Sequence, residues 1–359
     1  MDGTAIILTN GLLTHPNGKT AHGLVRGTER YTVLGIVDGA ATAGRDAGTL
    51  LFGQPAGIPV FTTLHDALTS LPARPDYAVI GVATSGGFLP ETLHSSIIAA
   101  LEAGISVVNG LHDCLATHPQ YVAAAEASGA RLVDIRRPKP FGELHFWTGD
   151  IYRVAVPRIA VLGADCAVGK RTTARLLRDA CRAQGLATEL IYTGQTGWLQ
   201  GNAHGIILDA LPNDFVSGEL EHAVVQCAEE RAPGLMLLEG QSSLLNPSGP
   251  CGAELLLSAD ARAVVLQLQP GRTIFKGCAE PPRYIADPAD EIDLIARYGA
   301  RVLAVTLNGT GMDDTSLAAC REALEARLGL PVIRPMVEDE LNRLSALARD
   351  YAAQYTPCA

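Results

Sequence analysis

The chain of 359 residues is long enough for two domains, since a domain commonly holds about 100–200 residues. Its net charge is −10, from 28 Lys and Arg against 38 Asp and Glu, which argues against a general binder of nucleic acids or anionic membranes. With 47% hydrophobic and 18% charged residues, the composition excludes a disordered chain, and glycine triplets and sustained heptads are lacking.

The sequence also predicts the cellular location of the protein. No stretch reaches the roughly 18–20 uninterrupted apolar residues of a membrane span, and the start, Met1–Thr4, does not resemble a signal peptide. We therefore expect a cytoplasmic protein that does not contact membranes. The eight cysteines form no C-x-x-C pair, so we expect reduced thiols and no bound metal. These cysteines are residues 114, 166, 181, 227, 251, 278, 320 and 358.

The first half alternates short apolar runs with helical stretches, such as 90–103, which has Pro90 in its first turn. Runs that are apolar on both faces are typical of parallel strands covered by helices. The predicted strands are residues 5–9, 31–37, 77–82 and 105–108. No G-x-G-x-x-G follows the first strand, so the nicotinamide fingerprint is missing. Asp38, at the end of the second strand, either binds a ribose or caps the next helix.

A domain boundary is predicted between residues 136 and 157. Pro138 and Pro140 interrupt both helix and strand there, and Pro157 precedes a new apolar run. We expect one α/β domain over residues 1–152 and a second over residues 153–359.

The second half opens with the strongest motif of the chain. An apolar strand at residues 158–162 is followed by G-A-D-C-A-V-G-K-R-T-T and then by a helix. This order is typical of a P-loop, in which backbone amides, the helix N-terminus and a lysine hold a phosphate group. The candidate cofactor-binding residues are Gly163, Asp165, Cys166, Ala167, Val168, Gly169, Lys170, Arg171 and Thr172.

The motif departs from a P-loop NTPase in two ways. The first glycine lies one residue too far from Gly169, and Arg171 stands where an NTPase has the Ser or Thr that binds Mg²⁺. Thr172 and Thr173 follow one and two places late. We therefore expect phosphate binding without metal-assisted transfer of a phosphoryl group.

Several polar residues follow apolar runs farther along the chain. Residues 235–239 form a strand that ends in Glu239, the place of the second acidic motif of P-loop proteins. The predicted strand at 191–197 ends in small polar residues, and the strand at 263–268 is followed by Arg272. Asp214 either caps a helix or faces the ligand, and Asn308, after the strand 301–307, either reads an adenine edge or forms a turn.

The motifs resemble those of a known family. The order G-A-D-C-A-V-G-K, T-G-Q-T-G and E-G is similar to the dethiobiotin synthetase branch of P-loop proteins. Seven blocks in order are similar to the D-glutamate N-acetyltransferase family, which shares the arginine at position 171. These blocks are residues 20–26, 81–90, 110–113, 163–173, 193–197, 214–218 and 239–244. The resemblance implies a Rossmann-like first domain and a P-loop NTPase-like, doubly wound α/β second domain.

The resemblance further implies transfer of an acetyl group from acetyl-CoA, as co-substrate, to the amine of D-glutamate in D-amino-acid catabolism. Such a reaction needs a base, donors for the oxyanion and cations for the substrate carboxylates. The candidates are Glu239 or Asp214 as the base, Gln195 and Gln241 for positioning, and Arg272 and Lys276 for the carboxylates. His22 and His112 are rival bases from the first half.

Two other functions stay open from the sequence. Glu239 as a magnesium ligand favours an ATP- and Mg²⁺-dependent ligase or kinase that acts on a small carboxylate or amine. A protein that binds a nucleotide or CoA without turnover is the third possibility. In each case we expect small-molecule ligands and a homo-oligomer.

Overall fold

The computed structural model describes residues 1–357, so Cys358 lies outside the described part. Its contacts divide the chain into two α/β units. The first unit holds residues 1–139 together with the short segment 195–202, and the second holds 140–194 and the residues from 203 onward. This division falls before the predicted boundary at 152/153, and it assigns 195–202 to the first unit.

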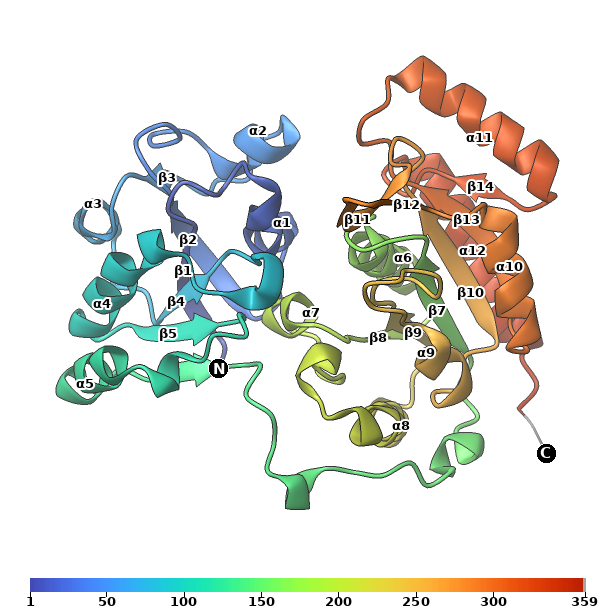
Figure 1. Cartoon of the computed structure of the whole chain (residues 1–359), viewed down its shortest axis with the longest axis horizontal. Helices are drawn as coiled ribbons and strands as arrows, with labels where there is room; N and C mark the ends of the chain where they lie inside the picture. Colours follow the sequence, from blue (N-terminus) through green and yellow to red (C-terminus); the bar gives the residue numbers. More distant parts are fainter. Residues whose placement is uncertain (358–359) are drawn as a thin grey trace. The chain divides into compact units, whose positions relative to one another are not determined.

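The first unit is built on a six-stranded parallel sheet with the order β3-β2-β1-β4-β5-β6, which is the Rossmann order (Figure 1). Its strands are β1 (Gly3–Leu8), β2 (Tyr31–Val37), β3 (Val60–Phe61), β4 (Tyr77–Ile80), β5 (Ser106–Asn109) and β6 (Leu132–Asp134). Its helices are α1 (Lys19–Arg26), α2 (Ala47–Phe52), α3 (Leu64–Ser70), α4 (His94–Glu102), α5 (Pro119–Ser128) and α7 (Gln195–Leu199). Separate apolar clusters pack on its two faces.

The second unit has its own six-stranded parallel sheet, with the order β14-β13-β10-β7-β9-β8. Its strands are β7 (Arg158–Gly163), β8 (Thr188–Ile191), β9 (Leu235–Glu239), β10 (Ala263–Leu268), β13 (Arg301–Leu307) and β14 (Val332–Ile333). Its helices are α6 (Lys170–Ala183), α8 (Asn213–Arg231), α9 (Ala253–Leu257), α10 (Pro288–Arg297), α11 (Asp314–Leu328) and α12 (Glu338–Gln354). An antiparallel hairpin, β11 (Ile274–Ala279) with β12 (Pro282–Tyr284), follows β10.

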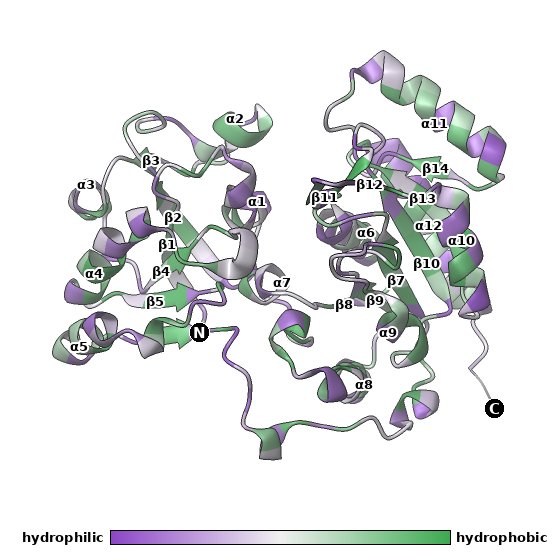
Figure 2. Ribbon diagram, viewed as in Figure 1, coloured by the Kyte–Doolittle hydropathy of each residue, from purple (hydrophilic) through white to green (hydrophobic). Residues whose placement is uncertain are grey.

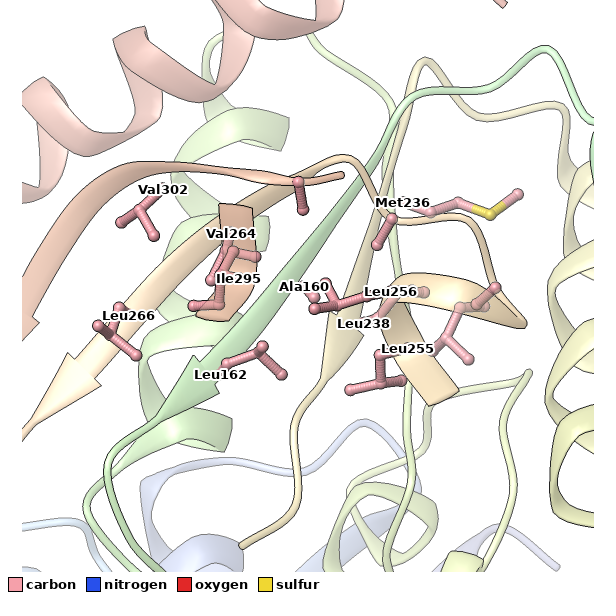
Figure 3. Close-up of a cluster of buried hydrophobic side chains, with 14 of the residues drawn as sticks. Ala160, Leu162, Met236, Leu238, Leu255, Leu256, Val264, Leu266, Ile295 and Val302 are labelled. Atoms are coloured by element: carbon pink, nitrogen blue, oxygen red, sulfur yellow. The ribbon is translucent and has the colours of Figure 1, made fainter. Parts of the chain in front are cut away.

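The strands of the second sheet are buried on both faces, as their continuous apolar runs predict. Side chains of β7, β9 and β10 meet those of α9, α10 and β13 in one cluster (Figure 3). In Figure 2 the strands are mostly green, whereas helices such as α11 carry purple bands. This packing fixes the end of β7, from which the P-loop leaves the sheet.

Residues 140–152 belong to the second unit because two buried carboxylates of α8 hold them. The Glu219 carboxylate accepts hydrogen bonds from the His145 amide at 2.9 Å and from His145 Nδ1 at 2.7 Å. The Glu221 carboxylate accepts bonds from the amides of three residues, Thr148, Gly149 and Ile151, at 2.6–3.1 Å. The proline pair therefore precedes a segment that is anchored to α8.

The structure confirms the α/β class and the central strands of both sheets, and it adds elements that the sequence analysis missed. These are the short strands β3, β6 and β14 and the hairpin β11–β12. The strand predicted at 191–197 is wrong, because β8 ends at Ile191 and Gln195 begins the helix α7. Asp214 does not precede a helix as expected: it lies inside the first turn of α8, whose N-cap is Pro212. Among the described residues, no helix is long and apolar enough to cross a membrane.

Candidate phosphate-binding site

The loop between β7 and α6 has the backbone of a phosphate-binding loop. Ala167 and Gly169 both have positive φ, +56° and +114°, and α6 begins directly at Lys170. The first helical bond runs from the Thr173 amide to the Gly169 carbonyl, so the amides just before it have no helical acceptor. A Cβ on Gly163 would lie only 2.8 Å from the Gln267 carbonyl oxygen, which explains the glycine. These amides and the helix dipole favour the binding of an anion at the loop.

Asp165 is the buried anchor of this loop. One carboxylate oxygen accepts bonds from the Cys166 amide at 2.7 Å and from Asn246 Nδ2 at 2.9 Å. The other accepts bonds from Arg272 Nη1 at 2.9 Å and from the Lys276 amide at 2.8 Å. Asp165 was a candidate ligand residue, but with four bonds accepted its carboxylate shapes the loop from within.

Arg272 and Lys276, the candidates for the substrate carboxylates, both donate hydrogen bonds to Asp165 in this loop. Arg272 Nη1 also donates to the Cys166 carbonyl at 2.7 Å, and about a quarter of its side chain, 24%, is exposed. Lys276 is exposed on β11. Both residues add positive charge beside the loop.

Lys170 is buried at the start of α6. Its Nζ donates to the Asp165 carbonyl at 2.7 Å and to the Ser242 carbonyl at 2.6 Å. Burial lowers the pKa of Lys170, while negative groups nearby, including Asp165 and Glu291, oppose that shift. The ammonium group is thus held by backbone carbonyls at the loop.

Arg171 lies opposite Glu239, the carboxylate at the end of β9. Arg171 Nη1 is 3.7 Å from Glu239 Oε1, and Glu239 is 2% exposed. Burial raises the pKa of Glu239, and the guanidinium of Arg171 partly offsets that effect. Within the described chain, Glu239 Oε2 has no hydrogen-bond partner. The guanidinium therefore faces the carboxylate that would hold Mg²⁺ in a P-loop NTPase.

The two threonines after Arg171 have side chains in different surroundings. Thr173 Oγ1 donates to Gln267 Oε1 at 2.5 Å beneath the loop, so its hydroxyl is occupied. Thr172 is half-buried in the first turn of α6. Over residues 1–357, no group of three or more His, Cys, Asp or Glu side chains is arranged to hold a metal ion.

Asn308 reaches the loop from the end of β13. Its Nδ2 donates to the Val168 carbonyl at 2.9 Å, and its Oδ1 accepts from the amide and hydroxyl of Thr310 at 3.1 and 2.7 Å. The predicted turn is present, and the side chain fixes Val168 in the loop. Its role as an adenine reader stays a prediction.

Gln241 and Asp214, two further candidates, lie in different surroundings. Gln241 Nε2 donates to Thr193 Oγ1 at 2.9 Å, and Thr193 Oγ1 in turn donates to the Glu239 carbonyl at 2.6 Å. Gln241 is therefore connected to Glu239. Asp214 is exposed on α8, and none of the described contacts connects its side chain to the loop. This placement gives no support to Asp214 as the base.

Gln195 belongs to the first unit, in a cluster at the end of β5. Its Oε1 accepts a bond from Arg136 Nη2 at 2.6 Å, and Arg136 Nε donates to the Gly110 carbonyl at 2.7 Å. Arg136 Nη1 is 2.8 Å from Nε2 of His112, one of the rival bases. The role of Gln195 in positioning the reacting groups stays a prediction.

Asp38 and His22 of the first unit have structural partners. The Asp38 carboxylate accepts bonds from the hydroxyls of Thr9 and Thr42 and from the amides of Gly11 and Leu13, at 2.6–2.9 Å. This satisfies the carboxylate without a ribose. His22 Nε2 lies 2.6 Å from the Leu13 carbonyl, and burial lowers the pKa of His22.

Sequence reasoning missed Glu291 and Asn246. Glu291, in the first turn of α10, is 3% exposed, and burial raises its pKa to about 7 against the attraction of Lys170. Asn246 is fully buried and anchors Asp165. Acidic residues in the first turn of a helix are common, so nothing in the sequence marked Glu291.

Comparisons with known proteins agree with this architecture. Residues 40–138 match the DUF1611 N-terminal Rossmann-like domain, and residues 145–344 match the DUF1611 C-terminal P-loop domain, both described as domains of unknown function. A crystal structure of a DUF1611 family protein from Anabaena variabilis is 26% identical, with a TM-score of 0.86, and covers 97% of this chain and 100% of its own.

Two curated relatives are named D-glutamate N-acetyltransferase. The protein from Tritonibacter scottomollicae is 29% identical over 278 residues, which cover 75% of this chain and 80% of the relative. The protein from a Pseudoalteromonas species is 28% identical over 263 residues, which cover 72% and 77%. These relatives confirm the resemblance found in the sequence.

Proposed function

This chain belongs to the DUF1611 family, and we propose that it is an N-acetyltransferase that moves the acetyl group of acetyl-CoA to the amine of D-glutamate. The products are N-acetyl-D-glutamate and CoA, in a step of D-amino-acid catabolism. The names of the two curated relatives, each aligned over about three quarters of the chain, support the acetyl transfer and the substrate.

The contact between Arg171 and Glu239 supports a phosphate-containing donor that is held but not cleaved at phosphorus. CoA carries a 3′-phosphate and a pyrophosphate, which the loop amides and Lys170 suit. A guanidinium 3.7 Å from Glu239 supplies a fixed positive charge at the place where an NTPase holds Mg²⁺. Arg272, anchored on Asp165, adds a second guanidinium at the loop.

Glu239 is the proposed base. The amine of D-glutamate is protonated near neutral pH, and Glu239 Oε2, buried and without a partner in the described chain, is suited to accept its proton. The free amine then attacks the thioester carbonyl carbon, so that the C–N bond forms and the C–S bond breaks, and the second proton that the nitrogen loses passes to the departing sulfur to give the CoA thiol. Gln241, connected to Glu239 through Thr193, is proposed to position the reacting groups. Lys276 and Arg272 are proposed for the substrate carboxylates.

A thermal-shift titration tests the donor first. Acetyl-CoA without metal should stabilise the protein, since a ligand at 100 times its Kd adds about 2.7 kcal/mol. Lys170→Ala should abolish the shift, and Lys139→Ala, which removes an exposed lysine of the first unit, should preserve it. A shift with Mg-ATP alone would overturn the proposal and favour a ligase or kinase.

Release of the CoA thiol tests the acceptor. Turnover should require D-glutamate and be far slower with L-glutamate, and Glu239→Gln should lower kcat while thermal shifts show that acetyl-CoA still binds. If acetyl-CoA binds but no amine accepts the acetyl group, the protein is a CoA-binding protein without this activity.

A further inference from the structure

Five large apolar side chains of the second unit are exposed in one region of its surface. Four are aromatic and lie in the segment 140–152, and the fifth is the last residue of α9. They are Phe141 (72% exposed), Phe146 (63%), Trp147 (41%), Tyr152 (52%) and Leu257 (53%), and we call them the aromatic surface. Single exposed apolar residues are ordinary on a protein, whereas a contiguous group of this size marks an interaction site.

Contacts join these side chains into one surface. The half-buried ring of Phe215, on α8, contacts the rings of both phenylalanines, with centroids 4.5 and 6.0 Å apart. The rings of Trp147 and Tyr152 meet edge to face at 5.8 Å. Because Phe146 and Trp147 are neighbours in the chain, the two groups of rings are continuous. Trp147 Nε1 donates to the Ser258 carbonyl at 3.2 Å, beside the leucine that ends α9.

The backbone beneath the aromatic surface is fixed to α8. The buried carboxylates of Glu219 and Glu221 accept hydrogen bonds from its amides. A Cβ on Gly218 would lie 2.1 Å from the His145 carbonyl oxygen, so the segment lies directly on the helix there. The His145 ring also stacks on the His222 ring of α8, with centroids 3.7 Å apart. A backbone that is already ordered loses little conformational entropy on binding, which favours association.

The area of the aromatic surface fits one side of a dimer interface. At roughly 200 Å² for each ring, the exposed fractions amount to about 500 Å² with the leucine included. A stable interface buries about 800 Å² on each partner, and about 65% of a homodimer interface is apolar. The apolar part of one side is therefore also about 500 Å².

The charged residues beside the rings favour a second copy of this chain as the partner. Glu143 and Asp214 are exposed and negative, and Arg153, with 86% of its side chain exposed, is positive. Each lies within two or three residues of a ring of this region in the chain, so both signs border the surface. When a face meets its own copy about a twofold axis, groups of opposite sign can pair across it. The two exposed carboxylates oppose binding to an anionic membrane.

We propose that the aromatic surface is the contact through which two copies of this chain form a homodimer about a twofold axis. In such a contact the same rings of both copies are covered, and Phe141 and Phe146, the most exposed rings, lose the most apolar area to water. The dimer goes beyond the acetyl transfer proposed above and does not depend on it.

Sedimentation equilibrium of the full chain at several concentrations tests the proposal. Phe146→Glu puts two like charges into the contact, one from each copy, and should raise the dissociation constant of the dimer about 100-fold. At concentrations where the wild type is associated, the variant should therefore sediment at half the wild-type mass. The matched control is Met336→Glu, which adds the same charge at a residue that is 69% exposed and follows β14, at the opposite edge of the sheet from β8. It should keep the wild-type mass.

Acrylamide quenching of Trp147 in a Trp198→Phe background gives a second readout, which needs no change in the aromatic surface. Quenching should weaken as the protein concentration rises, because the second copy covers the indole. A wild type that stays monomeric overturns the proposal, and so does Phe146→Glu at the wild-type mass. If Phe146→Glu does not fold, quenching that is independent of concentration overturns it. A monomer with Trp147 shielded at every concentration would mean that the chain covers these rings itself, which also overturns it.

Discussion

Glu291 should make the second unit less stable as the pH rises, and Glu291→Gln should remove that dependence. The side chain is 3% exposed, and burial raises its pKa from 4.5 to about 7. Between these values the folded protein holds a proton that the unfolded chain has released. The stabilisation from this group is therefore complete below pH 4.5 and is lost as the pH rises through 7.

The size of the effect follows from the shift. One pKa unit corresponds to about 1.4 kcal/mol, so a shift from 4.5 to about 7 amounts to about 3 kcal/mol in total. Linkage places about 2–3 kcal/mol of it between pH 5 and pH 8. Because the carboxyl group is buried, solvent does not screen the effect as it would at an exposed pair.

Urea unfolding followed by tryptophan fluorescence measures this quantity. The chain has two tryptophans, Trp147 in the second unit and Trp198 in the first, so a Trp198→Phe background reports on the second unit. The difference in unfolding free energy between Glu291→Gln and its parent should change by about 2–3 kcal/mol from pH 5 to pH 8. Asp290→Asn should track the parent. Parallel curves for Glu291→Gln and the parent would refute the assignment.

Three further changes test the anchors of the site. Glu221→Ala removes the acceptor of three backbone amides and should lower the free energy of unfolding by about 3 kcal/mol. It should also expose residues 140–152 to limited proteolysis, and unchanged cleavage would contradict this. Arg171→Ala should lower the free energy of unfolding by about 1–2 kcal/mol at pH 8, and the double variant with Glu239→Gln should regain part of that stability. If the losses of the two single variants simply add in the double variant, the pair is not coupled. Asn308→Ala releases the Val168 carbonyl and should weaken CoA binding severalfold in calorimetry with a stability change of about 1 kcal/mol; unchanged affinity would show that the anchor is dispensable.

The sequence was most informative where burial or backbone geometry leaves a local pattern. Central parallel strands such as β7 and β10 are continuous apolar runs because both faces are covered, and the loop before Lys170 needs glycine where φ is positive. The edge strands β3 and β14 hold two residues each, too few for any periodicity. Their pairing depends on tertiary context, which no local pattern records.

The site residues divide in the same way. Lys170 begins the helix after β7, and Glu239 is the last residue of β9, so parallel topology predicts that they lie at one edge of the sheet. Gln195 also follows a strand, but the chain passes to the first unit at that point without a proline or a run of charges to mark the change. Glu291 is buried by the packing of α10, so its raised pKa depends on tertiary structure that the sequence does not reveal.

Under the proposed function, Arg171 and Glu239 would change the chemistry of a P-loop whose backbone is kept. In phosphoryl transfer, a divalent cation bridges the phosphates and stabilises the negative charge that develops on the leaving oxygen. A guanidinium carries a single charge, is tied to its helix and cannot dissociate with a product. Such a cation neutralises a resident phosphate well but offers little to a breaking P–O bond. We therefore propose that the loop amides, combined with a cation fixed on α6, suit a donor whose reactive bond lies away from its phosphates.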